Sequence, residues 1–310
     1  MNKPFSIAIH GGAGTIHKSQ MSDEKEAAYK AALSLALNKG HDSLAEGNSA
    51  LDAVEIAVSS LEDSPLFNAG KGAVFTNESK HEMDASIMEG KSLSAGAVAG
   101  VEGIKNPIQL ARKIMEASDH VFLAGNGALE FAKEQGFSLM SDEYFYDELR
   151  YQQWQEALKN DVVQLDHSPL KEEKFGTVGA VAFDQSGNVA AATSTGGMTN
   201  KKFGRVGDSP MIGAGNYANN NTCAVSCTGS GEFFIRGVVA YDVSCLMEYK
   251  GLSLSEACKE VVHNRLLKIG GDGGLIAVDN TGALCLDFNT DGMYRGWKKS
   301  SGEELIEIYK

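Results

Sequence analysis

Two β-hairpin patterns in the second half of the chain constrain its fold more than any other feature. In the first, the apolar segments 178–184 and 189–195 flank the turn sequence Gln185-Ser-Gly-Asn. In the second, segment 275–279 is followed by Asn280-Thr-Gly and by another strand-like segment from position 283. Apolar runs separated by short turns rich in Asn, Ser and Gly are typical of hairpins. Matching residue types recur at the same spacing, namely Gly179, Asp184, Gly187 and Thr195 in the first and Gly274, Asp279, Gly282 and Thr290 in the second.

Helical patterns fill much of the remaining chain. We expect helices over 22–39, with Gly40 as the stop, after Ser49 as an N-cap, from Asn106-Pro107 onward, over 126–135 and over 234–249. A capping box at Ser253 and Glu256 opens another helix, over 253–268. Short strands are predicted at 5–9, 73–75 and 84–88. This mixed order predicts an α+β protein in which antiparallel sheets are covered by helices.

Composition and charge exclude several classes of partner. The net charge is −13, and an acidic surface repels phosphate backbones and anionic lipids, so we expect no nucleic-acid and no membrane binding. The N-terminal residues lack the apolar run of a signal peptide, and no segment has the length of a membrane span. We therefore expect a cytoplasmic protein with five reduced cysteines: Cys223, Cys227, Cys245, Cys258 and Cys285.

Glycine is abundant, with 35 residues against 5 prolines, and many of the glycines are clustered. Such clusters let backbone approach a ligand closely, so they indicate a small-molecule site built largely from main chain. The sequence Met88-Glu-Gly-Lys-Ser resembles the end of a phosphate-binding loop. That loop requires a glycine five residues before Gly90, and Ala85 occupies this position. His10, beside one glycine cluster, is either functional or a packed residue at a strand end.

The pair Gly176-Thr177 lies where a charged segment meets the first hairpin. A threonine hydroxyl becomes a good nucleophile when a base lies beside it, and the α-amine of an N-terminal threonine can act as that base. Thr177 is internal, so this chemistry requires cleavage of the Gly176–Thr177 bond. Glycine before it allows close attack on the carbonyl, and residues from about 156 to 176 read as a flexible linker. A self-cleaving chain is therefore a hypothesis that the sequence supports.

Seven ordered blocks resemble the plant-type asparaginase/isoaspartyl peptidase family of N-terminal-nucleophile hydrolases, threonine type. They are IHGGAGTI at 9–16, PLFNAGKGAVFT at 65–76, MDASIMEG at 83–90, GTVGAVAFD at 176–184, TSTGGMTNKKFGRVGDSP at 193–210, GAGNYAN at 213–219 and CTGSGE at 227–232. The resemblance covers nearly the whole chain. It implies a single domain, 1–310, folded as a four-layer αββα sandwich and cut into an α-subunit of 1–176 and a β-subunit of 177–310.

The resemblance also implies a role for each matching residue. Thr177 is expected to be the nucleophile for self-cleavage and for catalysis, and Thr195 to orient its amine. Arg205 and Asp208 are expected to bind the substrate α-carboxylate and α-ammonium, as suits a planar guanidinium and an opposite charge. The oxyanion hole and its surroundings are assigned to Thr228, Gly229 and Gly231, with Asn68 supporting the site.

The expected reaction is hydrolysis of β-aspartyl dipeptides and, more slowly, of L-asparagine, by a dimer of αβ heterodimers. No cofactor is implied for catalysis. The resemblance implies a structural sodium ion held by the main-chain carbonyls of Leu61, Glu62, Ser64, Phe67, Ala69 and Lys71, a ligand set that suits a hard cation. The Lys71 side chain is unusual in such a loop, and its ammonium is expected to weaken the site if it lies nearby.

Two alternatives remain at this stage. A glycosylasparaginase of the same superfamily would cleave the sugar–asparagine link, although the HGGAGTI opening and the N-terminal residues argue against it. From a different class, a non-catalytic protein could bind an amino acid or a nucleotide through its glycine-rich loops. Such a protein has no need for Gly-Thr after a disposable linker.

Overall fold

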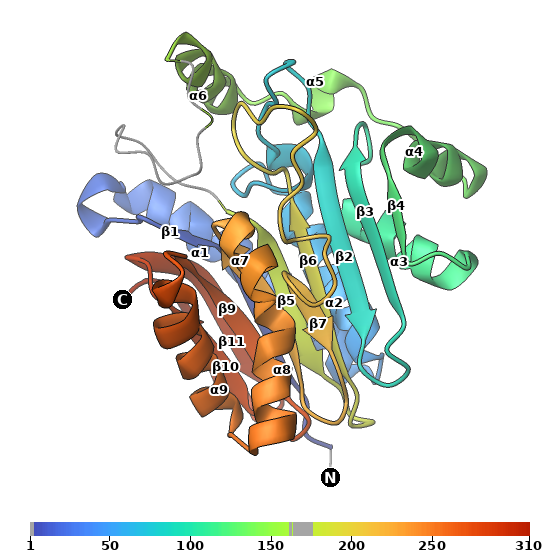
Figure 1. Cartoon of the computed structure of the whole chain (residues 1–310), viewed down its shortest axis with the longest axis vertical. Helices are drawn as coiled ribbons and strands as arrows, with labels where there is room; N and C mark the ends of the chain where they lie inside the picture. The colour runs from blue at the N-terminus through green and yellow to red at the C-terminus, as the bar shows by residue number, and fades with distance from the viewer. Residues whose placement is uncertain (1–2, 161–162, 164–175) are drawn as a thin grey trace.

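The computed structural model describes residues 3–160, 163 and 176–310, and these residues form two β-sheets and their covering helices (Figure 1). The larger sheet contains β1 (Ser6–Gly14), β2 (Met83–Glu89), β3 (Ala95–Val101), β4 (Phe122–Ala124), β5 (Val178–Phe183), β6 (Val189–Thr195), β11 (Gly292–Lys299) and β12 (Glu304–Tyr309). The smaller sheet contains β7 (Asn216–Ala218), β8 (Cys223–Gly229), β9 (Gly273–Asp279) and β10 (Leu284–Phe288).

The helices of the described residues are α1 (Asp23–Ala45), α2 (Ala50–Glu62), α3 (Pro107–Ala117), α4 (Gly125–Glu134), α5 (Asp142–Phe145), α6 (Glu148–Lys159), α7 (Gly231–Gly237), α8 (Val239–Lys250) and α9 (Leu254–Glu260). Short 3-10 turns lie at η1 (Lys18–Gln20) and η2 (Gly70–Gly72), and a π-helical segment, η3 (Val261–Leu266), continues α9. None of the helices described is long and apolar enough to cross a membrane.

The strand order of the larger sheet is β12-β11-β1-β5-β6-β2-β3-β4, and that of the smaller is β10-β9-β8-β7. Every neighbouring pair is antiparallel except β3 and β4, which are parallel. The two central strands of the larger sheet, β5 and β6, are the first hairpin of the sequence, whereas β9 and β10 of the smaller sheet are the second. Both hairpin predictions are therefore confirmed.

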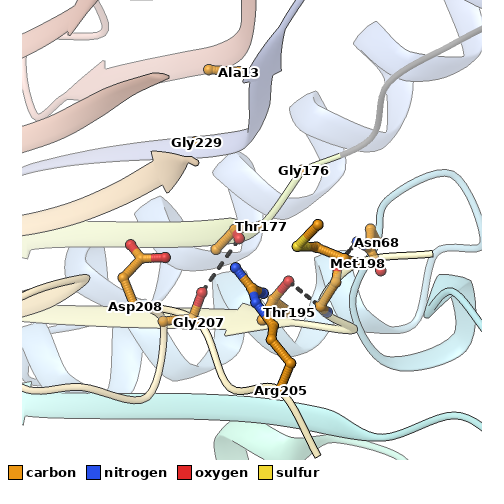
Figure 2. Close-up of a pocket in the computed structure, with 12 residues that line it drawn as sticks. Ala13, Asn68, Gly176, Thr177, Thr195, Met198, Arg205, Gly207, Asp208 and Gly229 are labelled. Carbon is orange, nitrogen blue, oxygen red and sulfur yellow. Dashed lines mark hydrogen bonds between the residues drawn. The ribbon is translucent and has the colours of Figure 1, made fainter. Parts of the chain in front are cut away.

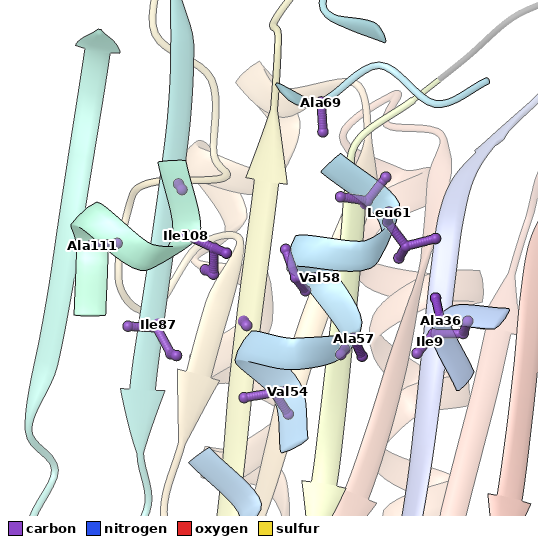
Figure 3. Close-up of a cluster of buried hydrophobic side chains, with 14 of the residues drawn as sticks. Ile9, Ala36, Val54, Ala57, Val58, Leu61, Ala69, Ile87, Ile108 and Ala111 are labelled. Carbon is purple, nitrogen blue, oxygen red and sulfur yellow. The ribbon is translucent and has the colours of Figure 1, made fainter. Parts of the chain in front are cut away.

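Helices and sheets lie in layers (Figure 1). Helices α1, α2 and α3 cover one face of the larger sheet, the smaller sheet packs on its other face, and α8 and α9 cover the outside of the smaller sheet. An apolar cluster fills the space between α1–α3 and the larger sheet, with Val54, Ala57, Val58 and Leu61 of α2 facing the strands (Figure 3). The structure is thus a mixed α and β fold with two facing sheets.

The helix starts agree with the capping signals in the sequence. The Ser49 side chain accepts a hydrogen bond from Asp52 N at the start of α2, and Ser253 and Glu256 form the predicted capping box of α9. Pro107 occupies the first turn of α3. Each of these signals acts between residues within one turn, which is why the sequence predicts them well.

Two segments differ from the predictions because of contacts with distant residues. Gly40 does not end α1; it lies inside the helix, where a side chain would collide with Ile7, so this glycine lets α1 pack closely on β1. Residues 73–75 are not a strand, because Val74 N donates to Asn68 Oδ1 at 3.2 Å and the Phe75 carbonyl accepts from Asn200 N at 2.8 Å.

The helix predicted over 234–249 is two helices separated at Val238, which has a left-handed backbone with φ 48°. The first amides of α8 donate outside the helix, Ala240 N to Ala214 O at 3.1 Å and Tyr241 N to Gly213 O at 2.8 Å. The break therefore joins α8 to the loop that precedes β7.

The linker predicted from about 156 to 176 begins too early. Residues 156–159 belong to α6, which is anchored by stacking of Trp154 on Phe75 with ring centroids 5.6 Å apart. The predicted linker residues 161–162 and 164–175 lie outside the described residues.

Candidate active site

Thr177 lies directly before β5 and is buried, with 8% of its surface exposed. The register of the β5–β6 hairpin pairs Val178 with Ser194, and its continuation by one residue places Thr177 opposite Thr195. The structure describes the uncut chain, with Gly176 preceding Thr177. The candidate nucleophile therefore lies at the open end of the β5–β6 hairpin, in the middle of the larger sheet.

The glycines around this junction are required by close backbone packing. Gly12 has φ +111°, and a Cβ there would lie 2.6 Å from Gly176 N. A Cβ on Gly176 would lie 3.0 Å from Thr228 Oγ1 and 3.1 Å from the Cα of Gly12. The end of β1 thus crosses the backbone just before Thr177, so a side chain is excluded at Gly12 and would be crowded at Gly176. This packing explains part of the glycine-rich HGGAG block.

A small pocket opens beside Thr177 (Figure 2), with about 40 Å³ of free space, enough for a few water molecules. Seven of its lining residues were singled out from the sequence: Asn68, Gly176, Thr177, Thr195, Arg205, Asp208 and Gly229. The other lining residues are Ala13, Gly197, Met198, Gly207 and Ser209. Residues from the first and second halves of the chain therefore meet at one site.

Ser209 is a polar neighbour of Thr177 that the sequence analysis missed. Its Oγ lies 3.3 Å from Thr177 Oγ1, and either hydroxyl can donate. Ser86 of β2 supports Ser209 by donating from its Oγ to the Ser209 carbonyl at 2.6 Å. Ser209 directly follows Asp208 in the sequence, so its position in the same block was the available signal.

Arg205 is paired with Glu232, a residue quoted in the CTGSGE block without a role. Arg205 Nε donates to Glu232 Oε1 and Nη2 donates to Oε2, both at 2.9 Å. Burial acts to raise the pKa of Glu232, but the hydrogen bonds and charge of Arg205 outweigh it and the pKa is lowered. This bidentate pair holds one edge of the guanidinium and leaves Nη1 beside Gly207.

Asp208 lies in the pocket wall with only 3% of its surface exposed. Burial raises the pKa of its carboxyl to about 7, partly offset by its own backbone amide and by the charge of Arg205. Among the described residues its Oδ2 has no hydrogen-bond partner. A buried acceptor without a partner is costly, so Asp208 is well placed to accept hydrogen bonds from a cationic ligand.

Two further predicted residues shape the pocket through the loop after β6. Asn68 Nδ2 donates to Gly197 O at 2.7 Å, and Thr195 Oγ1 accepts from Gly197 N at 3.1 Å. Asn68 also accepts from Val74 N, so it joins two loops at the pocket edge. No hydrogen bond between Thr195 and Thr177 is present among the described residues.

The predicted oxyanion-hole residues lie at the end of β8. Thr228 is fully buried and accepts a hydrogen bond from Ala13 N at 3.3 Å, whereas Gly229 lines the pocket with φ +148°. Gly231 does not line the pocket itself; a Cβ there would lie 2.8 Å from Asp208 Oδ1 and 3.1 Å from Arg205 Nη2. Gly231 therefore makes room for the two charged side chains.

The predicted cation loop follows α2. Leu61 and Glu62 end the helix, and the backbone then turns so tightly that a side chain at Gly70 would collide with the Glu62 carbonyl, and one at Gly72 with the Phe67 carbonyl. The Glu62 and Phe67 carbonyls thus lie against positions that only glycine can fill. The Lys71 ammonium lies 5.5 Å from the centroid of the Tyr144 ring.

The side chain of Glu62, for which the sequence predicted no role, is fully buried beside this loop. Its Oε1 accepts from Ile108 N at 3.0 Å and from Ser194 Oγ at 2.6 Å. Burial raises the pKa of Glu62 to about 8, although both hydrogen bonds act to lower it. Glu62 therefore connects α2, the start of α3 and the outer face of β6.

Comparison with known proteins identifies the family of the chain. The asparaginase family model matches residues 2–308. The chain is 55% identical to an isoaspartyl peptidase of Escherichia coli over 307 residues, covering 98% of this chain and 96% of the relative. It is 44% identical to an isoaspartyl peptidase/L-asparaginase of Xenopus laevis (98% and 94% covered) and 42% identical to a plant-type L-asparaginase of Pyrobaculum calidifontis (98% and 99% covered). The chain therefore belongs to the family of plant-type L-asparaginases and isoaspartyl peptidases, and it is a hydrolase.

Proposed function

We propose that the protein is an isoaspartyl peptidase with L-asparaginase activity that matures by cleaving its own Gly176–Thr177 bond. The observation that carries the proposal is the composition of one pocket. A buried threonine hydroxyl at a Gly-Thr junction shares it with a guanidinium and with the buried carboxyl group of Asp208, whose Oδ2 has no partner among the described residues. This combination suits a substrate that carries both an α-carboxylate and an α-ammonium beside a reactive amide.

Self-cleavage begins with attack of Thr177 Oγ1 on the carbonyl carbon of Gly176. The acyl group moves from nitrogen to oxygen, and water then hydrolyses the resulting ester. The products are a carboxylate on Gly176 and a free α-amine on Thr177. Because that amine has a pKa of about 7.7–8.0 in free peptides, it is partly neutral near pH 7 and can accept the hydroxyl proton in later turnovers.

Catalysis then uses the same hydroxyl on the side-chain amide of the substrate. Thr177 Oγ1 attacks the β-carbonyl carbon, its proton passes to the α-amine, and the leaving amine takes up that proton as it departs. Thr228 and the Gly229 N–H group stabilise the oxyanion; a donor of this kind contributes about 2.7–4 kcal/mol in other hydrolases. Water hydrolyses the acyl-enzyme and releases L-aspartate.

The two charged pocket residues account for substrate choice. The free edge of the Arg205 guanidinium donates two parallel hydrogen bonds to the α-carboxylate, and Asp208 accepts from the α-ammonium. The amide that is cut lies one carbon further along, toward Thr177. β-Aspartyl dipeptides and L-asparagine share this arrangement, so both are substrates, with L-asparagine the slower one.

We assign the two facing sheets and their covering helices to the four-layer αββα sandwich of N-terminal-nucleophile hydrolases. The mature enzyme contains the α-subunit 1–176 and the β-subunit 177–310, which stay together because β1 and β2 of the former pair with β11, β5 and β6 of the latter. We further propose that two αβ units assemble as a dimer of heterodimers.

We also propose that the loop after α2 binds a structural sodium ion through the main-chain carbonyls of Leu61, Glu62, Ser64, Phe67, Ala69 and Lys71. The tight turn that brings the Glu62 carbonyl against Gly70 and the Phe67 carbonyl against Gly72 supports this site, and so does the position of the Lys71 ammonium on the Tyr144 ring, which gives it another partner. A bound ion would hold the loop that carries Asn68 and play no part in proton transfer.

The proposal is tested by intact mass and activity of the purified protein. We expect the wild type to yield two chains divided before Thr177 and to hydrolyse β-aspartyl-leucine. The Thr177→Ala variant should remain one chain and be inactive, whereas Thr177→Ser, which keeps a hydroxyl, should still cleave. A wild type that stays intact, with activity that survives Thr177→Ala, would contradict the proposal.

A further inference from the structure

His10 of β1 is fully buried between the two sheets, although it carries a polar ring. The β1–β5 register places it opposite Gly179. A side chain at Gly179 would collide with both the His10 ring and the Ser226 hydroxyl, so the glycine in the first hairpin makes the space in which these two groups meet. The place of the His10 ring is therefore set by Gly179 of its own sheet and by Ser226 of the smaller sheet.

The hydrogen bonds of His10 define its tautomer. His10 Nδ1 lies 3.0 Å from the Thr177 carbonyl oxygen, which can only accept, so Nδ1 carries the proton. Burial lowers the pKa of His10 to about 3, despite the bond to Thr177, and the ring is neutral. Nε2 is then an acceptor, and the Ser226 hydroxyl, 2.9 Å away, donates to it.

Further hydrogen bonds between buried side chains continue from Ser226 away from Thr177. When Ser226 donates to His10 instead of to the Ala192 carbonyl at 3.2 Å, its oxygen can accept from the Thr193 hydroxyl at 2.7 Å, which otherwise donates to the Gly215 carbonyl at 3.2 Å. Thr193 in turn accepts from Asn216 Nδ2 at 3.3 Å, and the same amide group donates to the Ser86 carbonyl at 3.1 Å. All these side chains are fully buried. Hydrogen bonds that point the same way along a chain strengthen one another in a low-dielectric interior.

The chain of hydrogen bonds begins and ends near Thr177. One end reaches the Thr177 carbonyl through His10, and Ser86 at the other end donates from its hydroxyl to Ser209, whose own hydroxyl lies 3.3 Å from Thr177 Oγ1. Thr177 is thus held at its carbonyl by His10 of the larger sheet and at its hydroxyl by Ser209 of the loop before β7.

We propose that His10 is a positioning residue: its Nδ1–H group fixes the Thr177 carbonyl and thereby orients the hydroxyl and amine that react. This inference rests on the proposed function. Cleavage before Thr177 removes the peptide bond on its N-terminal side, so the new chain end keeps only its carbonyl side as an anchor. A donor at that carbonyl then restrains the main chain of the nucleophile, as Ser209 restrains its hydroxyl.

The test compares two substitutions at one position. An asparagine places its Nδ2–H group near the position of His10 Nδ1, whereas leucine has a similar size but no donor. We expect His10→Leu to lower both the self-cleavage rate and kcat about 100-fold, the loss typical of a slightly misplaced catalytic group. KM should stay within about twofold because Arg205 and Asp208 are untouched, and His10→Asn should recover most of kcat.

Equal losses in His10→Leu and His10→Asn, or a wild-type kcat in His10→Leu, would overturn the inference. If His10→Leu does not fold, nitrogen-15 NMR of the imidazole in the wild type decides: a protonated Nδ1 supports it and a protonated Nε2 refutes it. A wild type without β-aspartyl hydrolysis would instead refute the proposed function. An active wild type that needs Thr177 but not His10 would refute the positioning role alone.

Discussion

The two faces of the larger sheet differ sharply. The face under α1–α3 is almost wholly apolar, as Ile7 and Ile9 of β1 and Ala180 of β5 illustrate. The opposite face, toward the smaller sheet, is apolar only at one end, around Val181 and Ile276. At its other end lie the buried polar side chains of His10, Thr177, Ser86, Thr193 and Thr195, and Ser226 and Thr228 of β8 lie buried in the smaller sheet opposite them.

The difference follows from the period of a strand. Successive side chains point to opposite faces, so Ile9 belongs to the helix-covered core while its neighbour His10 belongs to the active-site side. One face is an apolar core, and the other combines packing with the candidate active site. Buried polar groups are tolerated there because nearly every one has a hydrogen-bond partner.

The largest expected effect on stability comes from truncating a side chain on the apolar face. Ile9→Ala should lower the free energy of unfolding by about 2–5 kcal/mol, since it removes a fully buried side chain from a packed core. Urea denaturation in the Thr177→Ala background, where one intact chain is expected, measures it. The kcat of Ile9→Ala in the cleaving background should stay near the wild-type value. A drop in kcat as large as that expected for His10→Leu would erase the distinction between the two faces.

A second prediction concerns Glu62, a buried ionisable group on the apolar face. Its pKa is raised from 4.5 to about 8, so the folded state retains a proton that the unfolded state releases between these values. The contribution of Glu62 to the free energy of unfolding is therefore at its full value below about pH 4.5. It decreases as the pH rises from about 4.5 to about 8, by up to about 1.4 kcal/mol per pH unit. Glu62→Gln, which cannot ionise, should show no such fall.

Denaturation at pH 5 and pH 8 tests this second prediction, again in the Thr177→Ala background. The stability of Glu62→Gln relative to its parent should increase with pH. The same dependence in both proteins would show that Glu62 does not govern it.

The smallest expected effect sharpens the comparison at the pocket itself. Arg205→Lys keeps the charge but loses the bidentate pair with Glu232, because an ammonium lacks the planar fork. We expect KM for β-aspartyl-leucine to rise about tenfold, equivalent to one net hydrogen bond of about 1.4 kcal/mol, with little change in thermal stability. Arg236→Lys is the matched control, since Arg236 is in α7 but lies over the Phe233 ring. An unchanged KM in Arg205→Lys would remove Arg205 from substrate recognition.

Much of the local structure was readable from the sequence. The two hairpins, the caps at Ser49 and Ser253 and the Gly176-Thr177 junction depend on residues that are neighbours in the chain. The seven blocks likewise identified the family and named most of the residues that line the pocket. Local signals failed where a distant residue overrode them: Gly40 packs against Ile7 instead of ending a helix, and the amides of α8 bond to a remote loop.

Only the tertiary structure assigned partners to the residues so identified. The sequence left His10 as either functional or packed, and contact with the Thr177 carbonyl, 167 positions away, decides its tautomer. Glu232 and Ser209 were visible in quoted blocks, yet their contacts with Arg205 and Thr177 arise only when separate segments meet. Residue types and local spacing can be read directly from the sequence, whereas hydrogen-bond partners and burial depend on how the two sheets face each other.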